Sequence, residues 1–201
     1  MTHSHTDDAP PAAEAAKRAI PRSPSSARTR IRAVTICAAL AAVAFSLSYI
    51  ENLIPLPIPV PGVKLGFANI ATLAALYILG GRAAFAVNIL RILLAGLMFT
   101  GAFAMFYALS GGILAVIAMI LLKRARVFSV VGVSVGGSAA HITGQILLAS
   151  LIVKNAAIFT SLPLLLISSI IAGAIVGLIV YLLLRALPRA IFRQRSGPRT
   201  H

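Results

Sequence analysis

The stretch GRAAFAVNILRILLAGLMFTGAFAMFYALSGGILAVIAMILLK, residues 81–123, decides the fold class. Between Arg82 and Lys123 it carries one charged side chain, Arg91, among residues that are almost all apolar or small. A membrane-spanning helix needs about 20 such residues, so this stretch is long enough for two crossings. Thr100 and Gly101 mark a break near its middle. We therefore expect helices over 83–99 and 102–122.

Apolar residues dominate the whole chain. Of its 201 residues, 59% are hydrophobic and 11% are charged, and the mean hydropathy is +0.97. A soluble domain has about 45–50% apolar and about 25% charged residues, so the composition predicts a membrane protein. Residues 33–186 have room for six spans, which we place at 33–51, 66–80, 83–99, 102–122, 128–153 and 162–186. The expected fold is an all-α bundle of six transmembrane helices.

The two ends of the chain differ from this bundle. Residues 1–32 are rich in Pro, Ser, Ala and Arg and have almost no large apolar side chains, so we expect a disordered basic tail. Residues 187–201 form a second basic tail. Most of the 18 Lys and Arg residues lie in these tails or in alternate connections, with Lys64 and Lys154 on the opposite side. Because basic residues collect in cytoplasmic loops, we place both termini in the cytoplasm of a multi-pass cell-membrane protein.

The charge balance excludes several classes of function. A formal net charge of +14 attracts anionic lipids, but nucleic-acid binding gives no reason for the charges to sort onto alternate loops, and we exclude it. Glu51 is the only acidic residue after residue 14, and Cys37 is the only cysteine. A catalytic metal site built on several carboxylates therefore cannot be made from this chain alone. No Gly-x-x-x-x-Gly-Lys-Ser/Thr loop occurs, so we expect no ATPase, no catalytic residue, no metal and no cofactor.

The segment ENLIPLPIPVPGVK, residues 51–64, interrupts the hydropathy pattern between the first two helices. Proline recurs at every second position from Pro55 to Pro61, which removes backbone donors and forbids a helix. An outward loop this apolar is expected to fold back over the helix ends. Two interpretations stay open: a stiff connector that packs on the bundle, or a lid at residues 52–64 over a cavity that opens outward.

Arg91 and Asn88 lie three residues apart, and therefore on one face of the helix predicted at 83–99. A buried arginine at this depth costs at least about 2.5–3.5 kcal/mol and needs a partner. Glu51 is the available carboxylate, at the outer end of the first helix. Arg91 therefore either pairs with Glu51 or awaits an anionic ligand.

The helix predicted at 128–153 carries a polar stripe at spacings of three or four residues, which places its members on one face. The stripe consists of Ser134, Ser138, His141 and Gln145. It is either a hydrogen-bonded helix interface or the wall of a ligand site. With Tyr107 on the helix before it and Asn69 at the start of the second helix, it predicts a polar interior under the proline loop. The candidate substrate-binding residues are Glu51, Lys64, Asn69, Asn88, Arg91, Tyr107, Ser138, His141 and Gln145.

The first helix presents small residues, among them Ala38 and Ala42 one turn apart. Such a flat face permits another helix to approach closely. It serves either internal packing or the docking of a partner membrane subunit.

Three blocks of the chain carry a family resemblance. They are PGVKLGFANI at 61–70, RILLAG at 91–96 and GVSVGGSAAHITGQ at 132–145. In this order and spacing they resemble the Gx transporter family, whose members are often labelled heptaprenyl diphosphate synthase component I. The resemblance covers about residues 33–186. Family members commonly have Asn after the histidine, where this chain has Ile142.

That family is in turn similar to the substrate-binding S-components of energy-coupling-factor transporters. The resemblance implies six helices with both termini inside, an outward loop that lids the substrate, and an alanine-rich face docked on a coupling subunit that works with ABC-type ATPases. The leading hypothesis is thus a subunit that captures a small polar or anionic solute from outside. The alternative is a noncatalytic membrane subunit of heptaprenyl diphosphate synthase, because known prenyltransferases use aspartate-rich motifs and this chain has no Asp after Asp8. A solitary facilitator is a third hypothesis.

Overall fold

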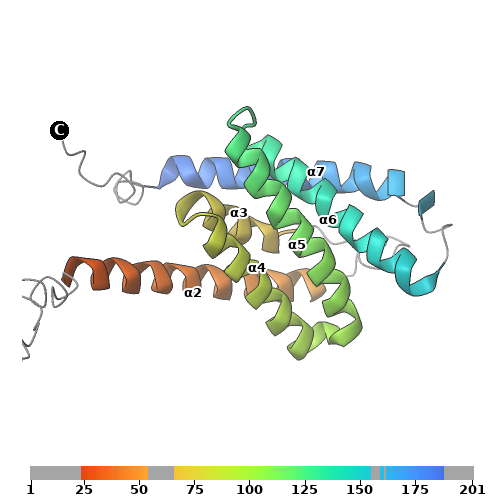
Figure 1. Ribbon diagram of the computed structural model, residues 1–201, viewed down its shortest axis with the longest axis horizontal. Helices are drawn as coiled ribbons and strands as arrows, with labels where there is room; N and C mark the ends of the chain where they lie inside the picture. Colours follow the sequence, from red (N-terminus) through yellow and green to blue (C-terminus); the bar gives the residue numbers. More distant parts are fainter. Residues whose placement is uncertain (1–23, 54–65, 155–158, 161, 188–201) are drawn as a thin grey trace, which may run out of the picture. The chain divides into compact units, whose positions relative to one another are not determined.

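The computed structural model describes residues 24–53, 66–154, 159–160 and 162–187. Within these ranges all the regular structure is helical, as predicted. The elements are α2 (Pro24–Leu53), α3 (Ala68–Ile78), α4 (Gly81–Ala95), the short π-helix η1 (Gly96–Thr100), α5 (Gly101–Ala125), α6 (Val130–Val153) and α7 (Leu162–Ala186) (Figure 1). Residues 1–34 and 35–201 form two compact units. Of the first unit, residues 24–34 are described and form the beginning of α2; the second unit contains everything that follows.

The first helix is longer than the sequence pattern predicted. It begins at Pro24, so residues 24–32 belong to α2 and not to the expected tail. Proline is compatible with the first turn of a helix, and the Ala and Arg residues that follow have high helix propensity. At its other end α2 includes Asn52 and Leu53, so the expectation of a loop over 52–64 is wrong for these two residues. The remainder of that loop, Lys64 included, lies outside the described residues.

Four segments of the described chain are long and apolar enough to cross a membrane, namely Arg30–Leu53, Gly81–Ala125, Val130–Val153 and Leu162–Ala186. The second of these has 45 residues, which as one straight helix would measure about 68 Å, roughly twice the thickness of a bilayer core. The chain is therefore a membrane-spanning protein. The crossing number of six and the cytoplasmic termini remain predictions.

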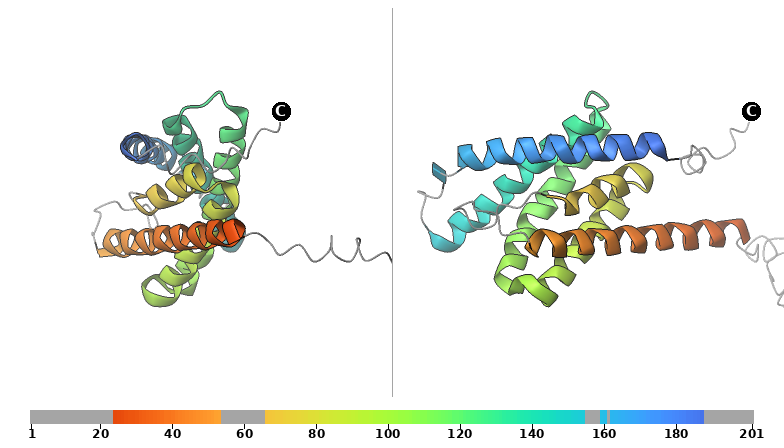
Figure 2. Two further views of the ribbon diagram at one scale, coloured as in Figure 1. Left: turned by 90° about the vertical axis from the view of Figure 1, so that its left-hand side faces the viewer. Right: turned by 180° about the vertical axis from the view of Figure 1, so that it is seen from behind.

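The segment Gly81–Ala125 is folded into a hairpin of α4 and α5 (Figures 1 and 2). A Cβ atom placed on Gly81 would lie 2.9 Å from Ile120, and one on Gly96 would lie 2.6 Å from Met105. The first pair joins the two distant ends of the segment, and the second pair joins residues close to its middle. The two helices are therefore antiparallel. The reversal follows η1 and occurs at Gly101, whose φ of +82° lies in the left-handed region that glycine adopts without strain.

The short helix α3 lies at the centre of the apolar core. It has 11 residues, or about 16 Å, which is too short to cross a core of about 30 Å. Its buried residues are Ala68, Ala71, Thr72, Leu73, Ala74, Ala75 and Leu76. Buried residues of α2, α4, α5 and α7 belong to the same core, among them Ala41, Ala44, Ala84, Val87, Val116, Val176 and Val180. A helix that ends inside a membrane needs such an enclosure, because lipid cannot satisfy its terminal backbone groups.

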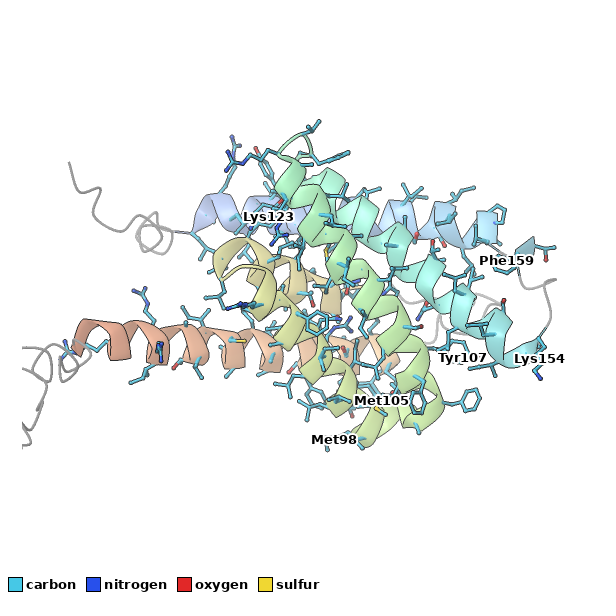
Figure 3. All side chains as sticks on the ribbon, in the orientation of Figure 1. Met98, Met105, Tyr107, Lys123, Lys154 and Phe159 are labelled. Carbon is cyan, nitrogen blue, oxygen red and sulfur yellow. The ribbon has the colours of Figure 1, made fainter. Side chains whose placement is uncertain are left out.

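The last turn of α3 is held by Lys123 of α5. The Lys123 ammonium donates to the Leu76 carbonyl oxygen at 2.6 Å and lies 4.3 Å from the centre of the Tyr77 ring. Figure 3 shows Lys123 and Tyr107 toward opposite ends of α5. A cation at this position complements the negative end of the α3 dipole.

Glycines allow α5, α6 and α7 to approach closely. A Cβ atom on Gly144 of α6 would lie 2.8 Å from the Ser110 carbonyl oxygen of α5. On α7, a Cβ on Gly177 would lie 2.7 Å from Val131 Cα, and one on Gly173 would lie 2.5 Å from Ser138 Oγ. Gly173 and Gly177 thus form a small-residue pair one turn apart, facing α6, as in other membrane helix interfaces.

Replacing Gly144 with Ala tests this packing. The new methyl group would meet backbone atoms of Ser110 and Gly111, at 2.8 and 3.0 Å, so α5 and α6 must separate. We expect the free energy of unfolding to fall by about 1–3 kcal/mol, measured as a lower midpoint of thermal unfolding in detergent. Gly132→Ala is the matched control, because its nearest neighbour would be Phe128 at an ordinary 3.4 Å. Equal midpoints for the two variants would contradict the packing described.

Candidate functional site

Arg91 is bound by two asparagine side chains. Its Nη2 atom donates to Oδ1 of Asn69, on the first turn of α3, and to Oδ1 of Asn88, one turn earlier on α4, at 3.0 Å in both cases. Asn88 is only 1% exposed. Neutral amide oxygens therefore hold the guanidinium group at this point and tie α3 to α4.

Glu51, in the last turn of α2, lies beside the beginning of α3. Its carboxylate is buried and accepts a hydrogen bond from the backbone N–H of Gly66. Gly66 has a φ of +77°, and its carbonyl oxygen accepts from the backbone N–H of Asn69 at 2.9 Å. Glu51 is also close enough to Arg91 for electrostatic attraction. Glu51 therefore attracts Arg91 electrostatically. The hydrogen bonds of Arg91 Nη2 go to the amide oxygens of Asn69 and Asn88 and not to Glu51.

A pair of glycines on α5 packs against Asn88 of α4 and His141 of α6. A Cβ atom on Gly112 would lie 2.7 Å from Asn88 Nδ2, and one on Gly111 would lie 3.1 Å from His141 Cε1. A larger residue at Gly111 would also meet the His141 carbonyl oxygen, at 2.7 Å, and one at Gly112 would meet Ile92, at 2.7 Å. The imidazole of His141 packs against Gly111 and lies within electrostatic range of Arg91. Polar groups from α2, α3, α4 and α6 therefore meet around Arg91.

Several polar atoms of this cluster have no hydrogen-bond partner among the described residues. They are Arg91 Nε, Asn88 Nδ2 and His141 Nδ1, and all three are buried. Leaving a buried polar atom unsatisfied costs about 1–3 kcal/mol. One of the three atoms belongs to the cation itself, and the other two belong to side chains of α4 and α6.

The comparison with protein families agrees with the resemblance seen in the sequence. A family model described as heptaprenyl diphosphate synthase component I matches residues 40–183. The chain belongs to this component I family, also known as the Gx transporter family. Comparisons with curated proteins and with solved structures found no match. The matched range contains Glu51, Asn69, Asn88, Arg91 and His141.

In this component I protein the structure brings together five of the predicted site residues, Glu51, Asn69, Asn88, Arg91 and His141. Gln145 lies next to them, because a Cβ on Gly111 would be 2.8 Å from its Cγ atom. Sequence reasoning missed Gly66 and Gly112, which act through a backbone N–H and through close packing. The doublet of Gly111 and Gly112 inside an apolar helix was the available signal.

The other predicted residues make different contacts. Ser138 faces Gly173 at the interface of α6 with α7. The Tyr107 ring lies 6.0 Å from that of Phe103, centre to centre, and Phe103 is exposed on the outer surface of α5. Ala38 and Ala42 are both exposed on α2. Among the residues that the structure describes, no three His, Cys, Asp or Glu side chains are grouped to hold a metal ion.

Asn69→Ala tests the bond between α3 and α4. It removes one acceptor of Arg91 Nη2, and we expect the free energy of unfolding to fall by about 1–3 kcal/mol. Asn52→Ala makes the same change at an exposed position of α2 and should stay within about 0.5 kcal/mol of the parent. Thermal unfolding of both variants in detergent measures the difference, and equal midpoints would show that Asn69 is not a structural partner.

Proposed function

We propose that this protein is the solute-binding membrane subunit of an importer of the energy-coupling-factor type. It captures a small polar or anionic solute from outside the cell, and separate subunits supply the energy. The observation that carries this proposal is the buried cluster around Arg91, in which three polar atoms have no partner in the described chain. Polar and charged groups inside membrane helices are expensive and mark ligand pathways as a rule.

The position of the cluster supports the same proposal. Asn69 lies on the first turn of α3, and α3 begins within the protein. Half-length helices that begin inside a membrane and direct their N-termini at a substrate are a recurrent device of transporters. Apart from Asn52 and Leu53, which belong to α2, the lid expected at 52–64 and its Lys64 lie outside the described residues.

Partners are required because the sequence has no ATP-binding loop of its own. We assign coupling to a membrane subunit driven by ABC-type ATPases. The exposed alanines Ala38 and Ala42 on α2 are a flat surface where such a subunit would dock. The basic connections of the chain would lie at the cytoplasmic leaflet and contact its anionic lipids.

Mass spectrometry of small molecules retained through mild-detergent purification tests the site. We expect a compound retained by the parent protein to be lost from Arg91→Ala, because the cation and its donors are removed, and to be bound with altered affinity by Glu51→Gln. Arg82→Ala removes an exposed cation from the same helix and should retain the compound at the parent level. Unchanged binding in both site variants would refute the assignment.

The family match favours a second candidate, a noncatalytic membrane subunit of heptaprenyl diphosphate synthase. The family name implies a second synthase component as partner. Catalysis would then belong to that component, because this chain offers a single carboxylate after residue 14 and several are needed to hold magnesium diphosphate.

Copurification distinguishes the two candidates. Recovery of the tagged chain with a membrane coupling subunit and a pair of ABC-type ATPases supports the importer. Recovery with an aspartate-rich prenyltransferase, and with no ATPase, overturns it in favour of the synthase subunit. The double variant Ala38→Leu with Ala42→Leu should reduce recovery of the coupling subunit, whereas Val43→Leu on the same helix serves as a control.

A further inference from the structure

The hydrogen bonds around Arg91 fix which way the Asn88 amide points. Asn88 Oδ1 accepts from Arg91 Nη2, and a guanidinium group has donors only, so the amide oxygen must face it. The Nδ2 atom is therefore directed away from Arg91, beside Gly112 of α5. It has no acceptor among the described residues. Since Asn88 is 1% exposed, water does not reach this donor readily.

Arg91 itself has a second donor available. Its Nη2 atom serves both asparagine oxygens, while its buried Nε has no partner within the described part of the chain. Both unsatisfied groups beside the cation are thus N–H donors. Their complement is an oxygen that accepts hydrogen bonds.

Electrostatics at this place favour an oxygen that carries negative charge. Arg91 is a permanent cation, and Asn69, which it contacts, belongs to the first turn of α3. The N-terminus of a helix has positive character, and Phe67 at its N-cap provides no side-chain hydrogen bond. Hydrogen bonds from charged donors to anionic oxygens are about twice as strong as those between neutral groups.

Glu51 is the obvious internal candidate for this role, but it does not satisfy these donors. Its carboxylate accepts from the Gly66 backbone N–H and attracts Arg91 at a distance. With Glu51 in this position, Arg91 Nε and Asn88 Nδ2 still have no partner in the ranges that the structure describes. The protein thus places one carboxylate of its own beside α3 and leaves two donors for another oxygen.

We infer that the solute of the proposed function is an oxyanion, a carboxylate or a phosphate, whose oxygen accepts hydrogen bonds from Arg91 Nε and Asn88 Nδ2. His141 borders the same place, since a Cβ atom on Gly111 would lie 3.1 Å from its Cε1 atom and its buried Nδ1 has no partner among the described residues. This inference rests on the proposed function for its description of the ligand as a transported solute, and on the described contacts alone for the chemistry of recognition.

The test measures the thermal unfolding midpoint of the purified full chain in detergent. Sodium acetate, phosphate and diphosphate are titrated separately against sodium chloride of equal ionic strength, and retained small molecules are identified by mass spectrometry. We expect at least one oxyanion to raise the midpoint in a saturable way, and the retained molecule to contain the same group. The anion that acts distinguishes a carboxylate from a phosphate.

Two variants locate the binding. Asn88→Asp has nearly the same shape but replaces the Nδ2 donor by a carboxylate oxygen, which repels an oxyanion. Arg91→Lys keeps the charge and can still donate to both asparagine oxygens, but it lacks Nε. We expect either variant to weaken binding of the active anion at least about tenfold, as the loss of a charge-assisted hydrogen bond implies. Arg82→Lys, the same change at an exposed position, should leave binding unchanged.

Each outcome separates the inference from the proposed function. An uncharged retained molecule that is lost from Arg91→Ala overturns the oxyanion and leaves the importer standing. A bound oxyanion in a chain that copurifies with a prenyltransferase and no ATPase supports the oxyanion and overturns the importer. Equal affinity in the parent and both variants, or no effect of any oxyanion and none retained, overturns the inference. If Asn88→Asp does not fold, Arg91→Lys decides.

Discussion

Inside a bilayer there is no water to satisfy polar groups, so each must find its partner within the protein. In this chain the constraint is most severe at Arg91, whose Nη2 donates to Asn69 and Asn88. The bond to Asn69 joins the first turn of α3 to the interior of α4, and the bond to Asn88 lies within α4. Lys123 holds the opposite end of α3 through the Leu76 carbonyl oxygen. A helix too short to span the membrane is thereby fixed at both ends by cations from its neighbours.

The close packing of small residues follows from the same requirement. Asn88 and His141 reach α5 where Gly111 and Gly112 provide no side chains. At the interface of α6 with α7, Gly173 and Gly177 bring α7 within contact of the α6 backbone and side chains. In lipid, association of helices depends on van der Waals contact and hydrogen bonds and not on the exclusion of water. Short distances between backbones are therefore a condition for polar side chains of different helices to meet.

These two requirements explain which features the sequence could predict. The helical class and most helix positions follow from hydropathy, and the common face of Asn88 and Arg91 follows from their spacing. The partnership of Arg91 with Asn69 depends on how α3 docks beside α4, for which no local pattern exists. The bond from Gly66 to Glu51 uses a backbone N–H, which every residue except proline has, so composition cannot indicate it. The spacing of the α6 stripe does not reveal its neighbours: Ser134 and Ser138 meet α7, whereas His141 and Gln145 meet α5.

The choice of amides around Arg91 has an electrostatic consequence. Two aspartates at positions 69 and 88 would bind the guanidinium with charge-assisted bonds and would cancel its charge. Asparagines make the same geometric contacts through neutral oxygens, so they orient the cation without neutralising it. Glu51 compensates the charge from a position beside α3, where it is also bound to Gly66. A protein selected for stability alone gains little from a buried cation held in this way, because burial of charge is costly unless the charge is paired. The arrangement keeps a positive charge oriented by neutral groups, as the oxyanion recognition proposed above would require.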